Sequence, residues 1–191
     1  MMRIIAIAAL PLALAACLGG GRDIPPTLAT LTTSAPAPSA IERASAPSDA
    51  LTIELPIVPQ ALAVTRVPVQ VGPTSIAYVE DVVWIDRPAT LFQQLLSETV
   101  TRMTGRVVLD PRQALLDPGT RVTGTLSHFG YHADTGEVVV IYDAAFATGD
   151  RVQNRRFEAR RPADGTAATV PYALNDAANE VAAQVAAWLG S

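Results

Sequence analysis

Apolar and polar residues alternate in several short segments after the first fifty residues, which is the pattern of half-buried β-strands. The clearest segments are residues 51–55 and 64–71. Pro68 favours an edge position for the second segment, because proline has no backbone N–H to donate to a neighbouring strand. Two further short strands are expected at residues 75–79 and 82–85, on either side of an acidic pair.

Two other segments place apolar residues at helical spacing. The first helix is expected to begin at Arg87-Pro88, because proline is tolerated in the first turn, and to end at Gly105. Its apolar positions are Leu91, Phe92, Leu95, Leu96, Val100 and Met103. The second helix is expected to begin near Ala167 or Pro171, and its apolar stripe is Leu174, Ala177, Ala178, Val181, Val185 and Leu189.

Three longer strands are expected between the helices, at residues 121–131, 137–147 and 151–161. Short glycine-containing links join them, which indicates antiparallel hairpins. A shorter strand is expected at residues 106–109. These elements predict an α+β fold over residues 50–191: a two-layer domain in which a mainly antiparallel sheet carries two helices on one face. The other sheet face is expected to be solvated or covered by a partner.

The first sixteen residues have the features of a secretory signal peptide. Arg3 precedes an apolar run at residues 4–14, which is too short to cross a bilayer, since that needs about 20 residues. The segment ends in Leu14-Ala15-Ala16-Cys17, which resembles the lipobox of bacterial lipoproteins. This resemblance implies cleavage before Cys17 and lipidation of that residue. Leu18 stands where an inner-membrane lipoprotein often has aspartate, which favours the periplasmic face of the outer membrane.

Residues 17–49 are predicted to form the lipidated N-terminus and a flexible linker. Glycine, proline, alanine, serine and threonine dominate this stretch, so it buries too little apolar surface to offset the entropy of ordering. An alternative remains open for residues 28–31, where a Leu-x-x-Leu pair would dock on the domain.

The charge and the cysteine content narrow the choice of partners. The chain has a net charge of −4 and no lysine, which argues against nucleic acid and against electrostatic attraction to anionic lipid. The acyl chains on Cys17 are therefore the expected membrane attachment. Cys17 is the only cysteine, so the sequence offers neither a disulfide nor a cysteine-based metal site.

The sequence shows no catalytic constellation, and neither enzymatic activity nor a cofactor is expected. His128 and His132 would share one strand face, but two histidines without a placed carboxylate make a weak metal site. No Gly-x-Ser-x-Gly motif is present. Gly124, inside a predicted strand, indicates a bulge or close packing. The pairs Arg155-Arg156 and Arg160-Arg161 fit an acidic partner or, more simply, a solvated strand face.

The order of these signals carries a family resemblance over residues 51–189. Arg66 begins a strand, Ile76-Ala77-Tyr78 follow, and Trp84 and Pro88 precede a leucine-bearing helix. Later positions that fit are Gly124-Thr125-Leu126, Arg156-Phe157 and the alanine-rich ending at Trp188-Leu189. After a lipobox, this order resembles the ABC-type transport auxiliary lipoproteins, the family of the PqiC-like lipoprotein of MCE lipid-transport systems. One departure is Ala29-Thr30-Leu31, which stands where the family often has Tyr-x-Leu.

The resemblance implies a non-enzymatic auxiliary component that docks an MCE assembly at the outer membrane. Its partners would be an MCE-domain protein and, through it, an ABC permease and ATPase, and the lipoprotein would form a homo-oligomeric ring. Ile76, Tyr78 and Trp84 are the candidate partner contacts, because exposed aromatic residues favour interfaces. The opposing interpretation is that Tyr78 and Trp84 belong to the core. The alternative function is assembly or activation of another periplasmic envelope complex.

Overall fold

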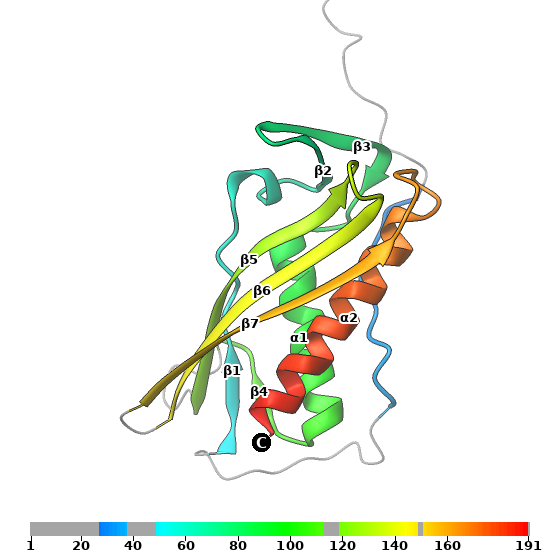
Figure 1. The fold of residues 1–191 in the computed structure, drawn as a ribbon. Coiled ribbons are helices and arrows are strands. Elements are labelled where there is room, and N and C mark those ends of the chain that lie inside the picture. The colour runs from blue at the N-terminus through cyan, green and yellow to red at the C-terminus, as the bar shows by residue number, and fades with distance from the viewer. Residues whose placement is uncertain (1–26, 38–48, 113–118, 149–150, 191) are drawn as a thin grey trace, which may run out of the picture.

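Three long strands form the centre of the sheet in the computed structural model, which describes residues 27–37, 49–112, 119–148 and 151–190 (Figure 1). They are β5 (Thr120–His132), β6 (Glu137–Thr148) and β7 (Arg151–Pro162). β5 pairs with β6 and β6 with β7, both antiparallel, so the predicted hairpins are confirmed. A register shift between Leu126 and His128 marks a bulge in β5.

Two shorter strands share the other edge of β5. β1 (Leu51–Ile53) pairs in parallel with the start of β5, and β2 (Arg66–Gly72) pairs in parallel with its end. β4 (Val108–Leu109) lies beyond β1, and β3 (Ser75–Val83) lies antiparallel beyond β2. The sheet is therefore mixed but mainly antiparallel, and the predicted α+β fold is confirmed.

The strands expected at residues 75–79 and 82–85 are one continuous strand, β3. Asp81 takes a left-handed backbone conformation with φ 56°, which aspartate tolerates better than most residues. The pairing with β2 shifts register between Arg66 and Pro68, so the acidic pair is absorbed as an irregularity within the strand.

Pro68 does not lie on an edge strand, because β2 has β3 on one side and β5 on the other. β2 meets β5 only at the pairs Val69–Tyr131 and Gln70–His132. At Gly130, a Cβ atom would lie 2.5 Å from the carbonyl oxygen of Pro68. The absence of a side chain at Gly130 therefore allows Pro68 to pack directly on β5. Pro68 lies outside the paired positions of β2 and β5, so its missing N–H removes no hydrogen bond between these strands.

Two helices cover one face of the sheet and lie side by side, each beginning at the upper end in Figure 1. α1 (Pro88–Thr104) has proline in its first turn and ends at Gly105, whose φ of 70° suits glycine, as predicted. α2 (Val170–Leu189) presents the predicted apolar stripe to the sheet and to α1. Within the described part of the chain, neither helix is long and apolar enough to cross a membrane.

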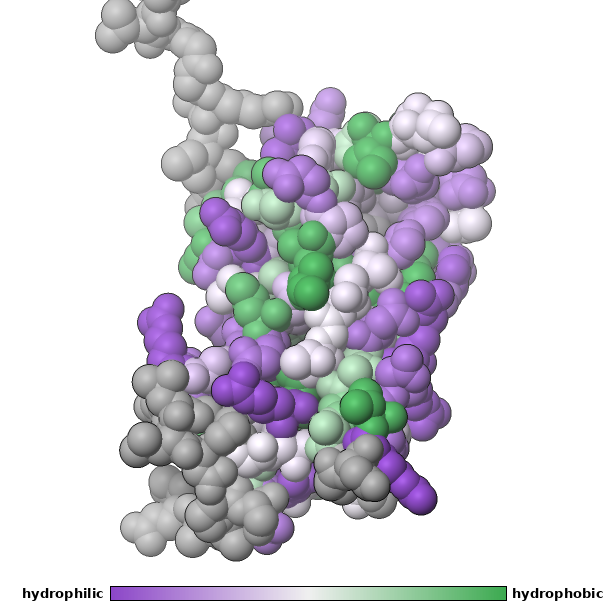
Figure 2. Space-filling model, turned by 90° about the vertical axis from the view of Figure 1, so that its left-hand side faces the viewer, coloured by the Kyte–Doolittle hydropathy of each residue, from purple (hydrophilic) through white to green (hydrophobic). Residues whose placement is uncertain are grey.

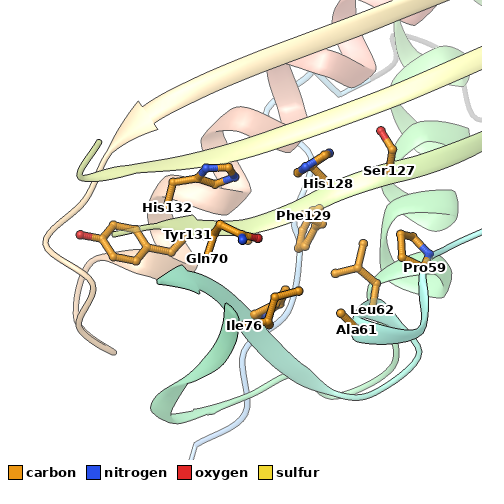
Figure 3. A pocket seen from close by; sticks show the side chains of 12 residues that line it. Pro59, Ala61, Leu62, Gln70, Ile76, Ser127, His128, Phe129, Tyr131 and His132 are labelled. Atoms are coloured by element: carbon orange, nitrogen blue, oxygen red, sulfur yellow. The ribbon is translucent and has the colours of Figure 1, made fainter. Parts of the chain in front are cut away.

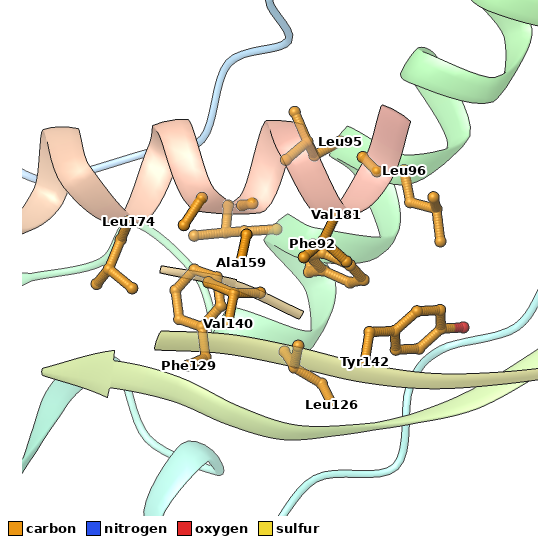
Figure 4. Close-up of a cluster of buried hydrophobic side chains, with 14 of the residues drawn as sticks. Phe92, Leu95, Leu96, Leu126, Phe129, Val140, Tyr142, Ala159, Leu174 and Val181 are labelled. Atoms are coloured by element: carbon orange, nitrogen blue, oxygen red, sulfur yellow. The ribbon is translucent and has the colours of Figure 1, made fainter. Parts of the chain in front are cut away.

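The core fills the space between the helices and the inner face of the sheet (Figure 4). Phe92 of α1 packs on Tyr142 of β6 with ring centroids 5.1 Å apart, and Trp84 packs on Phe129 of β5 at 5.7 Å. Alternate positions of β6 and, with a shift at the bulge after Leu126, of β5 supply the sheet side, namely Val122, Leu126, Phe129, Val138, Val140 and Tyr142. This alternation fixes which sheet face turns towards the helices.

Residues 27–37 do not behave as a linker but pack along the domain, and we call this segment the strap. Ala29 forms a parallel bridge to Trp84, with hydrogen bonds from its N–H to Val83 and from Ile85 N–H to its carbonyl, both 2.9 Å. Leu31 packs against the core. The docking alternative for residues 28–31 is therefore confirmed for Leu31, whereas Leu28, the other leucine of the pair, is 44% exposed. Residues 17–26 and 38–48 lie outside the described residues.

Candidate interaction surfaces

A pocket of about 240 Å³ opens along the free stretch of the β5 edge, between the positions where β1 and β2 pair with that strand (Figure 3). Ile57 forms an isolated bridge to Thr125 on one side of this stretch, and Tyr131 pairs with Val69 on the other. The lining is mostly apolar and aromatic, with a few polar groups, and comprises Pro59, Ala61, Leu62, Pro68, Gln70, Ile76, Ser127, His128, Phe129, Gly130, Tyr131 and His132.

The two histidines lie together in this pocket, as their even spacing predicts. Their ring centroids are 5.9 Å apart. Partial shielding from water lowers the pKa of His128, and the charge of His132 lowers it further. The described part of the chain contains no group of three or more His, Cys, Asp and Glu side chains placed to hold a metal ion. The pocket therefore offers apolar surface and, at His128, an imidazole that is neutral at pH 7.

The three predicted partner contacts do not form one surface. Ile76 is 53% exposed and lines the pocket, whereas Tyr78 is half-buried beneath the guanidinium of Arg66, which lies 4.2 Å from its ring centroid. Trp84 is only 1% exposed and belongs to the core. The interpretation of Trp84 as an exposed contact is therefore wrong, because Ala29 of the strap closes the strand edge beside it.

The sheet face that points away from the helices carries charges that are paired within the chain. Arg156 donates two hydrogen bonds to Asp143 across the β6–β7 ladder, at 2.7 and 3.1 Å. Arg160 bridges Glu158 at 2.7 Å and Glu137 at 3.6 Å. These pairs are the solvated strand face that the sequence favoured over an acidic partner.

Arg155 and Arg161, the other members of the Arg155-Arg156 and Arg160-Arg161 pairs, also have partners within the chain. Arg155 lies over the ring of Phe157 at 5.3 Å, and Arg161 forms an ion pair with Glu180 of α2. Gly124 confirms the expected close packing, since a Cβ atom there would lie 2.5 Å from the ring of Tyr142.

Side-chain amides of α2 hold the strap, and sequence reasoning missed them. Asn175 Oδ1 accepts a hydrogen bond from Thr32 N–H at 2.8 Å, and Asn179 Oδ1 accepts one from Ser34 N–H at 2.7 Å. Asn179 Nδ2 also donates to the Thr32 carbonyl at 2.8 Å. The available signal was an asparagine at position 179, one residue after Ala178 of the apolar stripe, where a buried amide requires partners.

Exposed large apolar side chains occur in several parts of the described surface, including a region after β1 and a region beside the strap. Leu55 and Ile57 lie after β1 and are exposed. On the face shown in Figure 2, apolar patches alternate with polar surface. The second region is a hollow of about 460 Å³ between the strap and the start of α2. Leu28 and Tyr172 line this hollow. Ile85 lies next to the strap, because its N–H donates a hydrogen bond to the carbonyl of Ala29.

These surfaces belong to a small α+β domain, and the strap packs along its helices on the N-terminal side of the chain. The chain belongs to the family of ABC-type transport auxiliary lipoprotein components, whose model matches residues 30–186. The match begins within the strap, which is therefore part of the family domain.

Solved structures share the fold. Protein XCC0632 from Xanthomonas campestris, assigned to the family model DUF330, is 16% identical, with a TM-score of 0.70 over 85% of this chain and 93% of that one. A second crystal structure, of an uncharacterized protein, is 15% identical, with a TM-score of 0.61 over 86% of this chain and 97% of that one. No curated protein matches the sequence.

Proposed function

We propose that this protein is a periplasmic lipoprotein anchored in the outer membrane through Cys17, where it acts as a non-enzymatic auxiliary component of an MCE/ABC-type lipid transport system. The observation that carries the proposal is the family match over residues 30–186, preceded by a lipobox. Its role is to dock the MCE assembly at the outer membrane. The acyl chains provide location, and the folded domain provides the contact.

The β5-edge pocket is the proposed contact surface for the MCE protein. Ile76 stands exposed at this pocket, and Tyr78 lies on the same strand with its ring stacked against Arg66. A concave apolar site with an aromatic neighbour suits an inserted apolar side chain of a partner. Through the MCE protein, the lipoprotein would join an ABC permease and ATPase, and several copies would form a ring.

Crosslinking followed by affinity capture tests the docking role. Tagged lipoprotein, solubilised in detergent after crosslinking in cells, should capture an MCE-domain protein. Ile76→Glu should lower that capture about tenfold, because a charge would occupy an apolar contact, corresponding to about 1.4 kcal/mol. Val152→Glu is the matched control, since Val152 is exposed at the far end of β7.

The outcomes separate the proposed function from its alternative. Capture of an MCE protein that is equally strong with Ile76→Glu would remove the pocket from the interface but keep the partner. Capture of a different envelope complex, with no MCE protein or permease, would favour the assembly or activation of that complex instead. An MCE–permease–ATPase gene cluster beside the gene would support docking.

A further inference from the structure

The strap shortens the distance that the lipid anchor can span. Thr27, the first described residue of the strap, follows Cys17 by ten residues. Ten residues reach at most about 35 Å when fully extended, whereas the 32 residues to Asp49 would reach roughly 110 Å. Because the strap is bound to the domain, only the shorter reach separates the domain from the anchor.

The strap also determines which end of the domain is near the anchor. Successive residues of the strap contact successive turns of the helices. Thr32 is hydrogen-bonded to Asn175 of α2, and Ser34 is hydrogen-bonded to Asn179, one turn further along. Ala35 accepts a hydrogen bond from Arg102, near the end of α1, at 2.6 Å. The strap therefore runs parallel to both helices and begins where they begin, at the upper end in Figure 1.

Three large apolar side chains are exposed beside the start of the strap, and we call them the strap-end patch. They are Leu28 at 44%, Ile85 at 62% and Tyr172 at 75% of full exposure. Leu28 and Tyr172 line the same hollow. Because Ala29 and Trp84 are bridged and side chains alternate along a strand, Leu28 and Ile85 project away from the buried Trp84.

We propose that the strap-end patch contacts the surface of the bilayer in which the Cys17 acyl chains are inserted. The inference rests on lipidation of Cys17 in the proposed function. A leucine, an isoleucine and a tyrosine are side chains that partition into the interfacial region, where tyrosine is enriched. A tether of ten residues makes this contact intramolecular, so a small apolar area is sufficient.

The neighbouring charges indicate which lipid chemistry suits the patch. Two exposed carboxylates, Asp81 and Asp86, and one exposed guanidinium, Arg87, lie close to it, so the acidic charges outnumber the basic one. Carboxylates are repelled by anionic headgroups, so the contact is hydrophobic and suits a zwitterionic surface. The patch would hold the domain with α1 and α2 pointing away from the membrane.

Fluorescence quenching in reconstituted vesicles tests the proposal. The full-length lipidated protein is placed in phosphatidylcholine–phosphatidylethanolamine vesicles containing brominated lipid, and an environment-sensitive probe is attached to an introduced cysteine. Cys17 carries the lipid, so the introduced thiol is the only reactive one. Quenching at Tyr172→Cys should exceed that at Met103→Cys and Val152→Cys at least twofold. Met103 lies in the last turn of α1, about 22 Å along the helix from its start, and is exposed.

Equal quenching at all three positions, or stronger quenching at Met103→Cys, would overturn the orientation. Quenching at Tyr172→Cys that required added phosphatidylglycerol would overturn the hydrophobic contact. Disulfide-linked dimers of the unlabelled Tyr172→Cys protein under oxidising conditions, together with no quenching of the labelled protein, would assign the patch to a second copy of the chain.

Two controls keep this result separate from the proposed function. Cys17→Ser protein should remain in the supernatant and show no quenching at any position. In the lipidated Asn175→Ala/Asn179→Ala protein, release of the strap should reduce the difference between positions 172 and 103. Neither measurement involves an MCE protein, so failure of the docking role would leave the membrane contact testable.

Discussion

At the scale of single residues, the ring of Tyr142 packs directly on Gly124. The tyrosine ring occupies the position that a side chain at Gly124 would fill, at 2.5 Å from its Cβ. An aromatic side chain over a strand glycine compensates for the missing packing there. The same ring contacts Phe92, so the glycine indirectly sets the spacing between β6 and α1.

Gly124→Ala should therefore destabilise the domain. The added methyl group displaces Tyr142 from a packed core, and overpacking of this kind costs about 1–3 kcal/mol. Chemical denaturation measures the free energy of unfolding. Thr123→Ala, at the adjacent exposed position of β5, should cost less than about 1 kcal/mol. Equal losses of unfolding free energy in the two variants would show that the Tyr142 ring can move aside without destabilising the domain.

Tyr142 should make the protein sensitive to alkali. Its hydroxyl is buried without a hydrogen-bond partner among the described residues, and burial raises its pKa above the usual value near 10. The folded state thus disfavours the phenolate of Tyr142. The contribution of this group to the free energy of unfolding is therefore complete below pH 10 and declines as the pH rises above 10. The loss is at most about 1.4 kcal/mol per pH unit. Lysine, which also titrates in this range, is absent from the chain.

Tyr142→Phe should remove that dependence. Unfolding free energies between pH 8 and 11.5 should decline less steeply in this variant than in the wild type. At pH 7 it should be as stable or more stable, because a buried hydroxyl without a partner is lost. Tyr172→Phe is the control, since the Tyr172 side chain is exposed, not buried in the core. A steep decline in Tyr142→Phe would assign the alkaline loss to other groups.

At the scale of elements, local patterns predicted those parts whose partners are close in the sequence. The two hairpins of β5, β6 and β7 follow from alternation and short links, and both helices follow from their apolar spacing. The parallel pairing of β1 and β2 with β5 was not predictable in this way. Each strand pairs with residues more than sixty positions away, so its neighbour depends on the assembled core.

The candidate site was predicted only in part for the same reason. Ile76 and the histidine pair share the pocket because strand alternation placed them on one face. Trp84 was misassigned because the segment that covers its edge comes from residues 27–37, more than fifty positions earlier. The composition of that segment suggested a linker, whereas its backbone is held by amides about 145 positions away.

Asn179→Ala should release the strap while the sheet and helices remain intact. Asn179 forms hydrogen bonds with Ser34 N–H and the Thr32 carbonyl, and their loss leaves partly buried backbone groups unpaired. The free energy of local opening should fall by about 1–3 kcal/mol. Hydrogen exchange should then accelerate tenfold or more at the Ser34 amide, with little change in β5–β7.

Gln184→Ala provides the matched control on the same helix, because Gln184 bonds only Glu180 in the described contacts. Exchange in the strap should stay at its wild-type rate in this variant. If Asn179→Ala accelerated exchange evenly over the whole domain, the strap would be part of the global folding unit and not a separate one.

At the scale of the whole molecule, the strap would connect the proposed lipid anchor at Cys17 to the orientation of the domain. It fixes one end of the sheet–helix stack within about 35 Å of Cys17. The β5-edge pocket lies along β5 in the gap between β1 and β2, and the paired charges lie on the sheet face away from the helices. If Cys17 is lipidated as proposed, the domain would present this pocket to a partner in a restricted set of directions.

Lengthening the chain between Cys17 and Thr27 should weaken this orientation without weakening attachment. Thirty inserted glycine and serine residues raise the root-mean-square span from about 17 Å to about 35 Å. The effective concentration of the strap-end patch at the bilayer should fall roughly eightfold, from the −3/2 power of a fourfold increase in length. The same insertion within residues 38–48 leaves the anchor-to-strap distance unchanged and is the control. Probe quenching at Tyr172→Cys should therefore fall only with the first insertion, and an equal effect of both would mean that the strap does not govern orientation.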